Sequence, residues 1–264
     1  MLRPRITPCL LVHKGGLVKT VNFTDPKYVG DPVNAVKIFN EKEADELIVV
    51  DIDASAQGVE PNFRLIAQLA AECRMPLCYG GGIRTPEQAK RIIGLGVEKV
   101  AISSIAIEQP EVVGRIAEEI GRQSVVVVLD VKLARGDRYE VWTHNAKRNS
   151  GLTLEQGIAL AQANGAGEIL VNSIDRDGVM KGYDIPLARR VRELTTLPLT
   201  ILGGAGKLDD IEQLIAACGV IGASAGSLFV FKGMYKAVLI NYPNPARKET
   251  LVRAALGDAP AVAR

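Results

Sequence analysis

The sequence has little that would direct it to nucleic acid, membranes or metal ions. Its formal net charge is only +2 over 264 residues, so no basic surface for nucleic acid or anionic lipid is predicted. Its apolar runs are far shorter than the roughly 20 residues of a membrane span. The stretch 8–12 after Arg3 and Arg5 is also too short for a signal-peptide core. We therefore expect no nucleic acid, no membrane and a cytoplasmic location.

Histidine and cysteine are scarce as well. The chain has 2 His and 4 Cys, without a CxxC spacing or a His/Cys cluster. This argues against a transition-metal site and a disulfide framework, and it is typical of buried thiols in a reducing compartment. Aromatic residues make up 5% of the chain against 47% hydrophobic residues, which predicts a large core of aliphatic side chains. No metal and no cofactor are expected.

What the chain does have is a glycine-rich motif that occurs twice. Leu77–Arg84 reads LCYGGGIR, and Leu199–Gly206 reads LTILGGAG. A helical pattern follows each copy, and then a short run that ends in small residues, at 100–104 and at 223–227. Glycines at a strand end let backbone N–H groups approach a ligand, and a helix N-terminus favours anions. The alternative is that these glycines only form tight strand–helix turns.

The matched pair of motifs predicts two phosphate sites and a ligand with two phosphate-like ends. The residues expected to bind phosphate are Gly81, Gly82, Ser103 and Ser104 in one copy and Gly203, Gly204, Gly226 and Ser227 in the other.

Eight short apolar runs alternate with helical patterns, which predicts an α/β fold consisting of a single (β/α)8 TIM barrel. The repeat divides the barrel (1–245) into halves of about 1–122 and 123–245, and leaves a C-terminal tail at 246–264. We expect the 235–242 stretch to close the last helix. The predicted strands are 5–12, 47–51, 77–79, 99–102, 125–130, 168–172, 199–202 and 220–223. The predicted helices are 31–43, 62–73, 85–95, 111–120, 154–164, 186–195 and 208–217, and hairpins are expected at 17–23 and 138–143.

In such a barrel the chemistry lies at the carboxyl ends of the strands. Asp130 ends an otherwise apolar strand there, and partial burial would suit it to general acid/base catalysis. The alternative is a carboxylate that only accepts hydrogen bonds from loop amides. Under the repeat its counterpart is Leu11, which can transfer no proton. The residues expected around this mouth are Cys9, Leu11, Asp51, Gly82, Ser104, Asp130, Asn172, Asp177, Gly204 and Ser227.

Motifs spread over residues 1–242 resemble those of the cyclase subunit of imidazole glycerol phosphate synthase. The matching stretches are RITPCL (5–10), VKTVNF (18–23), GDP (30–32), ADEL (44–47), DIDAS (51–55), YGGGI (79–83), DRDG (175–178) and GGAG (203–206). The resemblance implies a barrel that cyclises a bisphosphorylated substrate with ammonia from a glutaminase subunit, docked at the amino-terminal barrel face.

The resemblance also assigns roles to residues. Asp130, Lys19 and Asp177 match catalytic positions, but Leu11 replaces the second catalytic aspartate. Two other mouth residues depart from the family pattern: Ser103 replaces an asparagine, and Asn172 replaces a threonine. An ammonia gate in the family matches Arg5, Glu46, Lys99 and Glu168. Without the resemblance, these four residues could equally form an ordinary salt-bridged layer.

Further stretches resemble a branch of the family that serves acetamidino-sugar biosynthesis for surface polysaccharides. They are CLL (9–11), DPKYVGDP (25–32), LCYGGGI (77–83), SLFVF (227–231) and KAVLINYP (236–243). This branch implies a barrel that takes ammonia from a glutaminase and supplies an ATP-dependent amidotransferase acting on an N-acetyl sugar. The chain shows no glutaminase nucleophile constellation and no P-loop of its own.

Three functions remain open at this point. The favoured one is the ammonia-channelling partner subunit, because it explains a complete gate beside a lost carboxylate. The alternative is the cyclase of histidine biosynthesis, which converts its bisphosphate and ammonia to imidazole glycerol phosphate and an aminoimidazole carboxamide ribotide. The third is the isomerase of the same half-barrel ancestry, which needs the missing carboxylate and no gate. Whether the chain is itself an enzyme is left open.

Overall fold

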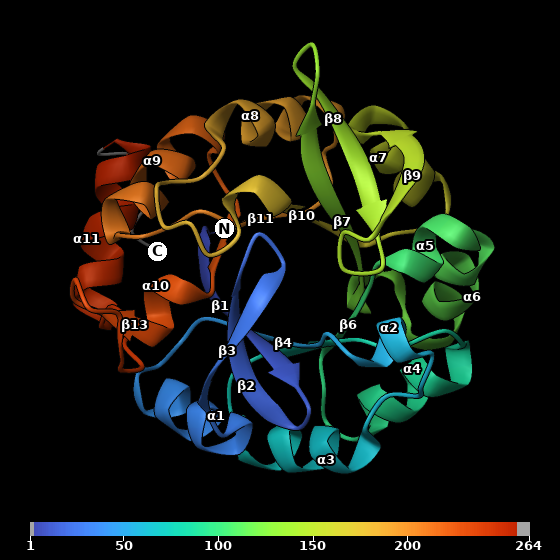
Figure 1. Cartoon of the computed structure of the whole chain (residues 1–264), viewed down its shortest axis with the longest axis horizontal. Helices are drawn as coiled ribbons and strands as arrows, with labels where there is room; N and C mark the ends of the chain where they lie inside the picture. The colour runs from blue at the N-terminus through green and yellow to red at the C-terminus, as the bar shows by residue number, and fades with distance from the viewer. Residues whose placement is uncertain (1–2, 258–264) are drawn as a thin grey trace, which may run out of the picture.

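The structure is a computed structural model that describes residues 3–257. Its centre is a closed ring of parallel strands, which confirms the predicted single (β/α)8 barrel (Figure 1). The ring closes because β10 pairs with β7 as well as with β11, and β12 pairs with β1. In spatial order the strands are β1 (Arg5–His13), β4 (Leu47–Asp51), β5 (Leu77–Gly80), β6 (Lys99–Ile102), β7 (Val125–Ala134), β10 (Glu168–Ser173), β11 (Leu199–Leu202) and β12 (Gly222–Ala225).

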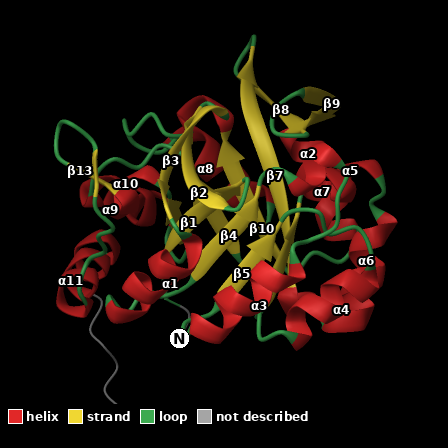
Figure 2. Ribbon diagram, turned by 60° about the horizontal axis from the view of Figure 1, so that its bottom comes forward, coloured by secondary structure: helices red, strands yellow, loops and turns green. Residues whose placement is uncertain are grey.

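Helices surround this ring (Figures 1 and 2). Polar side chains set several of their starts: the Asp31 carboxylate accepts from Asn34 N, and Thr85 and Thr153 each form a capping box. The long helices are α1 (Pro32–Glu41), α3 (Phe63–Glu72), α4 (Pro86–Gly94), α6 (Glu111–Ile120), α7 (Leu154–Ala163), α8 (Ile185–Leu194), α9 (Leu208–Cys218) and α11 (Pro245–Leu256). Shorter turns are α2 (Ala54–Gln57), α5 (Ser104–Glu108), α10 (Ser227–Val230) and the 3₁₀ segments η1 (Arg122–Ser124) and η2 (Ile174–Arg176).

Two antiparallel hairpins extend the sheet at the carboxyl ends of the strands. The first is β2 (Gly16–Val21) with β3 (Thr24–Gly30), which follows β1. The second is β8 (Arg138–Thr143) with β9 (Arg148–Thr153), which follows β7. Since β1 and β7 stand four positions apart in a ring of eight strands, the hairpins rise from opposite sides of the barrel (Figure 1).

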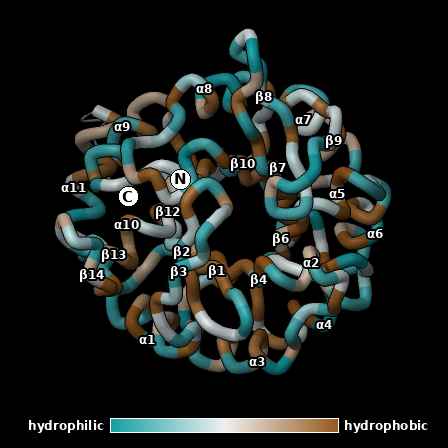
Figure 3. Tube along the Cα trace, viewed as in Figure 1, coloured by the Kyte–Doolittle hydropathy of each residue, from teal (hydrophilic) through white to brown (hydrophobic). Residues whose placement is uncertain are grey.

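Side chains along each strand alternate between two apolar cores. On β1, Ile6 and Leu10 point outward into the core shared with the helices, while Cys9 points into the barrel. The inner core is small and consists of Cys9, Ile48, Cys78, Ala101, Val126 and Leu170. Figure 3 shows the hydrophobic stretches following the strands and the hydrophilic ones on the outer turns. A few apolar and sulfur-containing side chains therefore fill the middle of the barrel interior.

The C-terminal region differs from the sequence-based expectations. Residues 235–242 do not close a helix; they include β14 (Ala237–Val238), which forms a small hairpin with β13 (Phe231–Lys232). The predicted tail is wrong as far as Leu256, because α11 buries Leu251 and anchors Lys248 Nζ 2.6 Å from Asp45 Oδ1. Residues 258–264 of the predicted tail lie outside the described residues.

The last barrel strand was also predicted two residues too early. It spans Gly222–Ala225 rather than 220–223, because small residues rather than the apolar pair Val220–Ile221 form the tightly packed segment. The division into half-barrels stays a prediction. Over residues 3–257, no helix is long and apolar enough to cross a membrane.

Candidate functional site

A cavity of about 360 Å³ opens at the carboxyl ends of the barrel strands. All ten residues predicted to surround the mouth line it: Cys9, Leu11, Asp51, Gly82, Ser104, Asp130, Asn172, Asp177, Gly204 and Ser227. Lys19 and the remaining predicted phosphate-binding residues also line it, namely Gly81, Ser103, Gly203 and Gly226. The structure thus brings the two glycine motifs and the acid/base candidate to one cavity.

The first glycine motif follows β5, and it lines the cavity together with the residues at the start of α5. Gly81 and Gly82 have φ of +113° and +75°, in the region that favours glycine. A Cβ on Gly81 would overlap the carbonyl oxygen of Asp51, and Gly82 N donates to Ser55 Oγ over 3.1 Å. Ser103 and Ser104 complete this part of the wall. We call these residues, Gly81, Gly82, Ser103 and Ser104, the first cradle.

The second motif repeats this arrangement: it follows β11, and it lines the cavity together with the residues at the start of α10. Gly203 and Gly204 have φ of +100° and +112°, and a Cβ on Gly204 would overlap the carbonyl oxygen of Gly182. Gly226 and Ser227 occupy the places that Ser103 and Ser104 take in the other half. We call Gly203, Gly204, Gly226 and Ser227 the second cradle. A cation lies beside it, because the Lys19 ammonium lies against Gly226.

Asp130 lies at the base of the cavity on β7. Burial raises the pKa of this carboxyl to about 6, against hydrogen bonds that lower it. Asn172 Nδ2 donates to Oδ1 over 3.2 Å, and Ser103 Oγ donates to Oδ2 over 3.3 Å. A carboxyl with a pKa near neutrality can both take up and release a proton under physiological conditions.

Leu11 faces Asp130 from the opposite side of the ring. It lies on β1 in register with Val50 of β4 and packs against the inner core. No carboxylate is therefore available on this side of the mouth at the β1 position.

Lys19 and Asp177 are two more buried titratable groups of the mouth. Lys19 Nζ donates to the carbonyl oxygen of Cys9 over 2.5 Å, and burial lowers the pKa of Lys19 although Cys9 and Asp177 favour its charge. Burial raises the pKa of Asp177 as well, against hydrogen bonds from Thr20 and Phe23. Both groups are thus easier to neutralise than their free counterparts.

Burial also shifts the pKa values of two further mouth residues, Asp51 and Cys9. Burial raises the pKa of Asp51, although its Oδ1 accepts from Asp53 N over 2.9 Å and from Ala54 N over 3.1 Å. Burial also raises the pKa of the Cys9 thiol to about 11, which keeps it protonated and unreactive.

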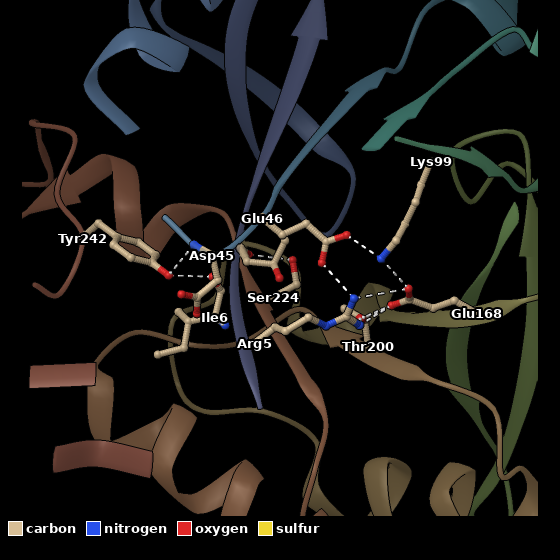
Figure 4. A network of polar contacts seen from close by, with 10 residues as sticks. Arg5, Ile6, Asp45, Glu46, Lys99, Glu168, Thr200, Ser224 and Tyr242 are labelled. Atoms are coloured by element: carbon tan, nitrogen blue, oxygen red, sulfur yellow. Dashed lines mark hydrogen bonds and ion pairs between the residues drawn. The ribbon is translucent and has the colours of Figure 1, made fainter. Parts of the chain in front are cut away.

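At the amino-terminal end of the barrel, the four predicted gate residues form a closed ring of ion pairs (Figure 4). Arg5 lies 3.0 Å from Glu46 and 2.5 Å from Glu168. Lys99 lies 2.8 Å from Glu46 and 2.9 Å from Glu168, so each cation bridges both acids. Burial would raise the pKa of Glu168, but Arg5 and Lys99 outweigh it and lower that pKa. The ring consists of two bases and two acids, so its formal charges cancel.

The tips of the two hairpins cross the mouth. Thr20 Oγ1 and Phe23 N donate to Asp177 Oδ2 over 2.7 and 3.2 Å, which ties the β2–β3 tip to the segment after β10. Asn145 Nδ2 donates to the Ile52 carbonyl over 2.7 Å, which ties the β8–β9 tip to the segment after β4.

Sequence reasoning missed the β8–β9 tip. His144 N donates to Ser104 Oγ over 3.0 Å, and His144 Nε2 lies 2.8 Å from Glu108 Oε1. His144, Asn145 and Ala146 all have φ between +54° and +59°. These left-handed residues form the turn of the hairpin in the structure. No pattern in the sequence indicates that this turn lies over the first cradle.

Metal-binding geometry is not found in the described part of the chain, where no three His, Cys, Asp or Glu side chains gather at a suitable distance.

Comparisons with known proteins agree on one family. Residues 5–236 match the family model described as "Histidine biosynthesis protein". A protein of Leptospira interrogans named "Putative imidazole glycerol phosphate synthase subunit HisF" is 58% identical over 254 residues, which cover 95% of this chain and 99% of that protein. A similarly named subunit from Pseudomonas aeruginosa is 50% identical over 92% of this chain and 97% of its own. The "Imidazole glycerol phosphate synthase subunit HisF" of Hyphomonas neptunium is 41% identical over 88% of this chain and 91% of its own.

Proposed function

The chain belongs to the family of histidine biosynthesis proteins and to its HisF-like members, and we propose that it is the ammonia-using barrel subunit of an imidazole glycerol phosphate synthase. The observation that carries this proposal is the position of Asp130 in a cavity with a glycine cradle on each side. The expected reaction joins ammonia to a bisphosphorylated substrate and yields imidazole glycerol phosphate and an aminoimidazole carboxamide ribotide.

The two cradles suit the two ends of this substrate. Glycines with positive φ bring backbone N–H groups close to a phosphate, and each cradle leads into the first turn of a short helix. Lys19 supplies a cation at the second cradle. A substrate that spans both cradles places its middle over the line between Leu11 and Asp130.

Asp130 is the group proposed to move protons there. With a pKa of about 6 it is mostly ionised at pH 7 and can accept a proton from the attacking nitrogen, then return it to a leaving group. Asn172 and Ser103 hold its two oxygens in place. Lys19 on β2 and Asp177, which follows β10, are further titratable groups proposed to take part.

Ammonia is proposed to enter from the other end. A glutaminase subunit docked over the amino-terminal face would release it at the ring of Arg5, Glu46, Lys99 and Glu168. Because each cation bridges both acids, the ring can open by exchange of partners without leaving a charge unpaired. The sequence resemblance and the position of the ring support this partner.

Leu11 favours a second candidate function. A barrel that lacks one of two acid/base groups could pass ammonia from the glutaminase to a separate ATP-dependent amidotransferase that makes acetamidino sugars for surface polysaccharides. The relatives' names mention no sugar or amidotransferase, and they support the synthase instead. The sugar function, initially favoured, is therefore retained only as the second candidate.

One assay separates the two functions. The purified chain receives the bisphosphate substrate and excess ammonium salt, which bypasses any glutaminase, and imidazole glycerol phosphate is measured. Turnover by the wild-type chain at an enzyme-like rate supports the synthase. Turnover only in a Leu11→Asp variant contradicts it, and shows that the mouth binds this substrate without processing it. Turnover in neither also contradicts it; glutaminase and amidotransferase pull-downs with this chain then test the second candidate.

A further inference from the structure

Two buried oxygens inside the barrel have no hydrogen-bond partner among the described residues. They are Thr7 Oγ1 and Asn172 Oδ1, on residues that are 0% and 8% exposed. Thr7 lies on β1 between Arg5 of the ring and Cys9, and alternation along the strand points all three inward. Asn172 lies at the other end of the interior and lines the mouth. The two oxygens therefore lie at opposite ends of the inner core.

Thr7 belongs to a polar seam on one wall of the interior. Thr200 Oγ1 donates to Glu168 Oε1 over 2.7 Å and accepts from Arg5 Nη2 over 3.3 Å, so the seam starts at the ring. Ser224 Oγ donates to the Thr7 carbonyl over 2.9 Å, and Ser224 and Thr7 are paired in register (Figure 4 shows Ser224 beside the ring). We call Thr200, Ser224 and Thr7 the polar seam; it crosses β11, β12 and β1.

A glycine on β12, the middle strand of the seam, makes room for one of its hydroxyl groups. A side chain on Gly222 of β12 would overlap Thr200 Oγ1, so this glycine leaves the hydroxyl its place above the ring. Between the ring and the mouth, the other strands face the interior with apolar or sulfur side chains, namely Ile48, Cys78, Ala101, Val126 and Leu170. This middle part of the described interior thus has one polar wall.

Asn172 Oδ1 is fixed as an acceptor by its neighbour. Its amide nitrogen donates to Asp130, which leaves the carbonyl oxygen free for a donor from the cavity. Buried polar atoms are almost always satisfied by protein or by a small bound molecule. An apolar interior would favour a neutral molecule over a cation.

We propose that the barrel interior contains two sites for a single small neutral hydrogen-bonding molecule, ammonia or water, one at Thr7 Oγ1 and one at Asn172 Oδ1. A hydroxyl can accept from such a molecule or donate to its lone pair, and an amide oxygen can accept from it. The assignment of ammonia rests on the proposed function. In that function ammonia moves through the barrel from the ring to the mouth, and the two sites are the first and the last along its path.

The sites themselves are tested without any activity. Crystal structures of the chain and of Thr7→Val and Thr7→Ser variants are compared at a resolution that shows ordered water. We expect a bound molecule within hydrogen-bond distance of Thr7 Oγ1 in the wild type and the Ser variant, and its loss in the Val variant, which has nearly the same shape. A wild-type structure with no molecule at Thr7 or at Asn172 overturns the proposal. So does a molecule that stays in place in Thr7→Val.

Transport is tested by comparing two nitrogen sources. With the glutaminase subunit present, product formation is measured once with glutamine and once with ammonium salt, which enters from the mouth. Thr7→Val should lower the glutamine-supported rate relative to the ammonium-supported rate on the order of tenfold, about the effect of one lost hydrogen bond. Thr7→Ser should leave the ratio unchanged.

The outcomes distinguish the inference from the function on which it rests. An unchanged ratio in Thr7→Val overturns the role in ammonia transport. A wild-type complex that uses ammonium but never glutamine overturns the proposed glutaminase pairing, and the crystal structures then still decide whether the two sites exist.

Discussion

Asn172 Nδ2 donates a hydrogen bond of 3.2 Å to Asp130 Oδ1, and this bond fixes the orientation of both side chains at the base of the mouth. The ionised carboxylate can only accept, so the amide nitrogen faces it and the amide oxygen faces away. This one hydrogen bond therefore places the acid/base candidate Asp130 beside a free acceptor, Asn172 Oδ1.

Replacement of Asp130 by Asn should remove most of the proposed activity. The loss of a positioned acid/base group costs on the order of 10²- to 10⁴-fold in rate. The wild-type rate, measured at a constant concentration of free ammonia, should fall as the pH drops through about 6, where Asp130 becomes protonated. A pH profile that stays flat between pH 5 and 7 contradicts the assignment of Asp130 as the base.

The same substitution should stabilise the fold at neutral pH. The pKa of Asp130 is raised from its ordinary value to about 6, so the folded state binds more protons than the unfolded state between these values, and its stability decreases as the pH rises through them. Asp130→Asn should therefore raise the free energy of unfolding by on the order of 2 kcal/mol at pH 7 and hardly at all at pH 4. Urea titrations at both pH values measure the difference.

Removal of one acid from the ring should be costly. Glu168→Gln leaves Arg5 and Lys99 with a single shared acid, Glu46, and one uncompensated positive charge in a buried setting, and we expect a loss of about 2–4 kcal/mol in the free energy of unfolding. The exposed pair of Lys90 and Glu119 is a matched control, since Glu119→Gln should leave the urea midpoint unchanged. Equal effects of the two substitutions would show that the ring contributes no more than a surface ion pair.

The backbone of the second cradle should tolerate no side chain. In Gly204→Ala the new Cβ overlaps the carbonyl oxygen of Gly182, and φ of +112° is unfavourable for alanine. We expect a loss of about 2 kcal/mol or more in stability, together with weaker binding of inorganic phosphate by calorimetry. Gly94→Ala is the control, because that position lies in α4 with free space around it and should lose nothing.

The hairpin tip over the first cradle should be loosened by the loss of the Asn145 side chain. Asn145→Ala removes the bond to the Ile52 carbonyl, and residues 144–146 then keep their left-handed backbone with less support. Hydrogen exchange of the tip amides should become faster, while exchange in the barrel strands stays unchanged. Faster exchange throughout the barrel would instead show that the contact supports the whole fold.

Local patterns made much of the fold predictable. The alternation of apolar runs and capped helices marked the barrel, and the glycines at 81–82 and 203–204 marked the turns that need positive φ. Such features follow from neighbouring residues alone.

Other features depend on contacts between distant segments. Asn145 and Ile52 are 93 residues apart, and no local pattern indicates that they meet. Thr7 resembled any other strand residue, and only its burial beside Ser224 shows its unpaired hydroxyl. The hairpin at 231–238 was missed because its two strands of two residues are too short to show a period.

The crossing of the two hairpin tips has a consequence for the molecule as a whole. Each tip is anchored on the opposite half of the sequence: the 20–23 arm on Asp177, and the 144–145 arm on Ile52 and Ser104. Exchange of arms between equivalent units is the geometry of an isologous, segment-swapped dimer. Under the predicted division into half-barrels, the chain would have the form of such a dimer with its two subunits joined by a single covalent link, and neither half could complete its own mouth alone.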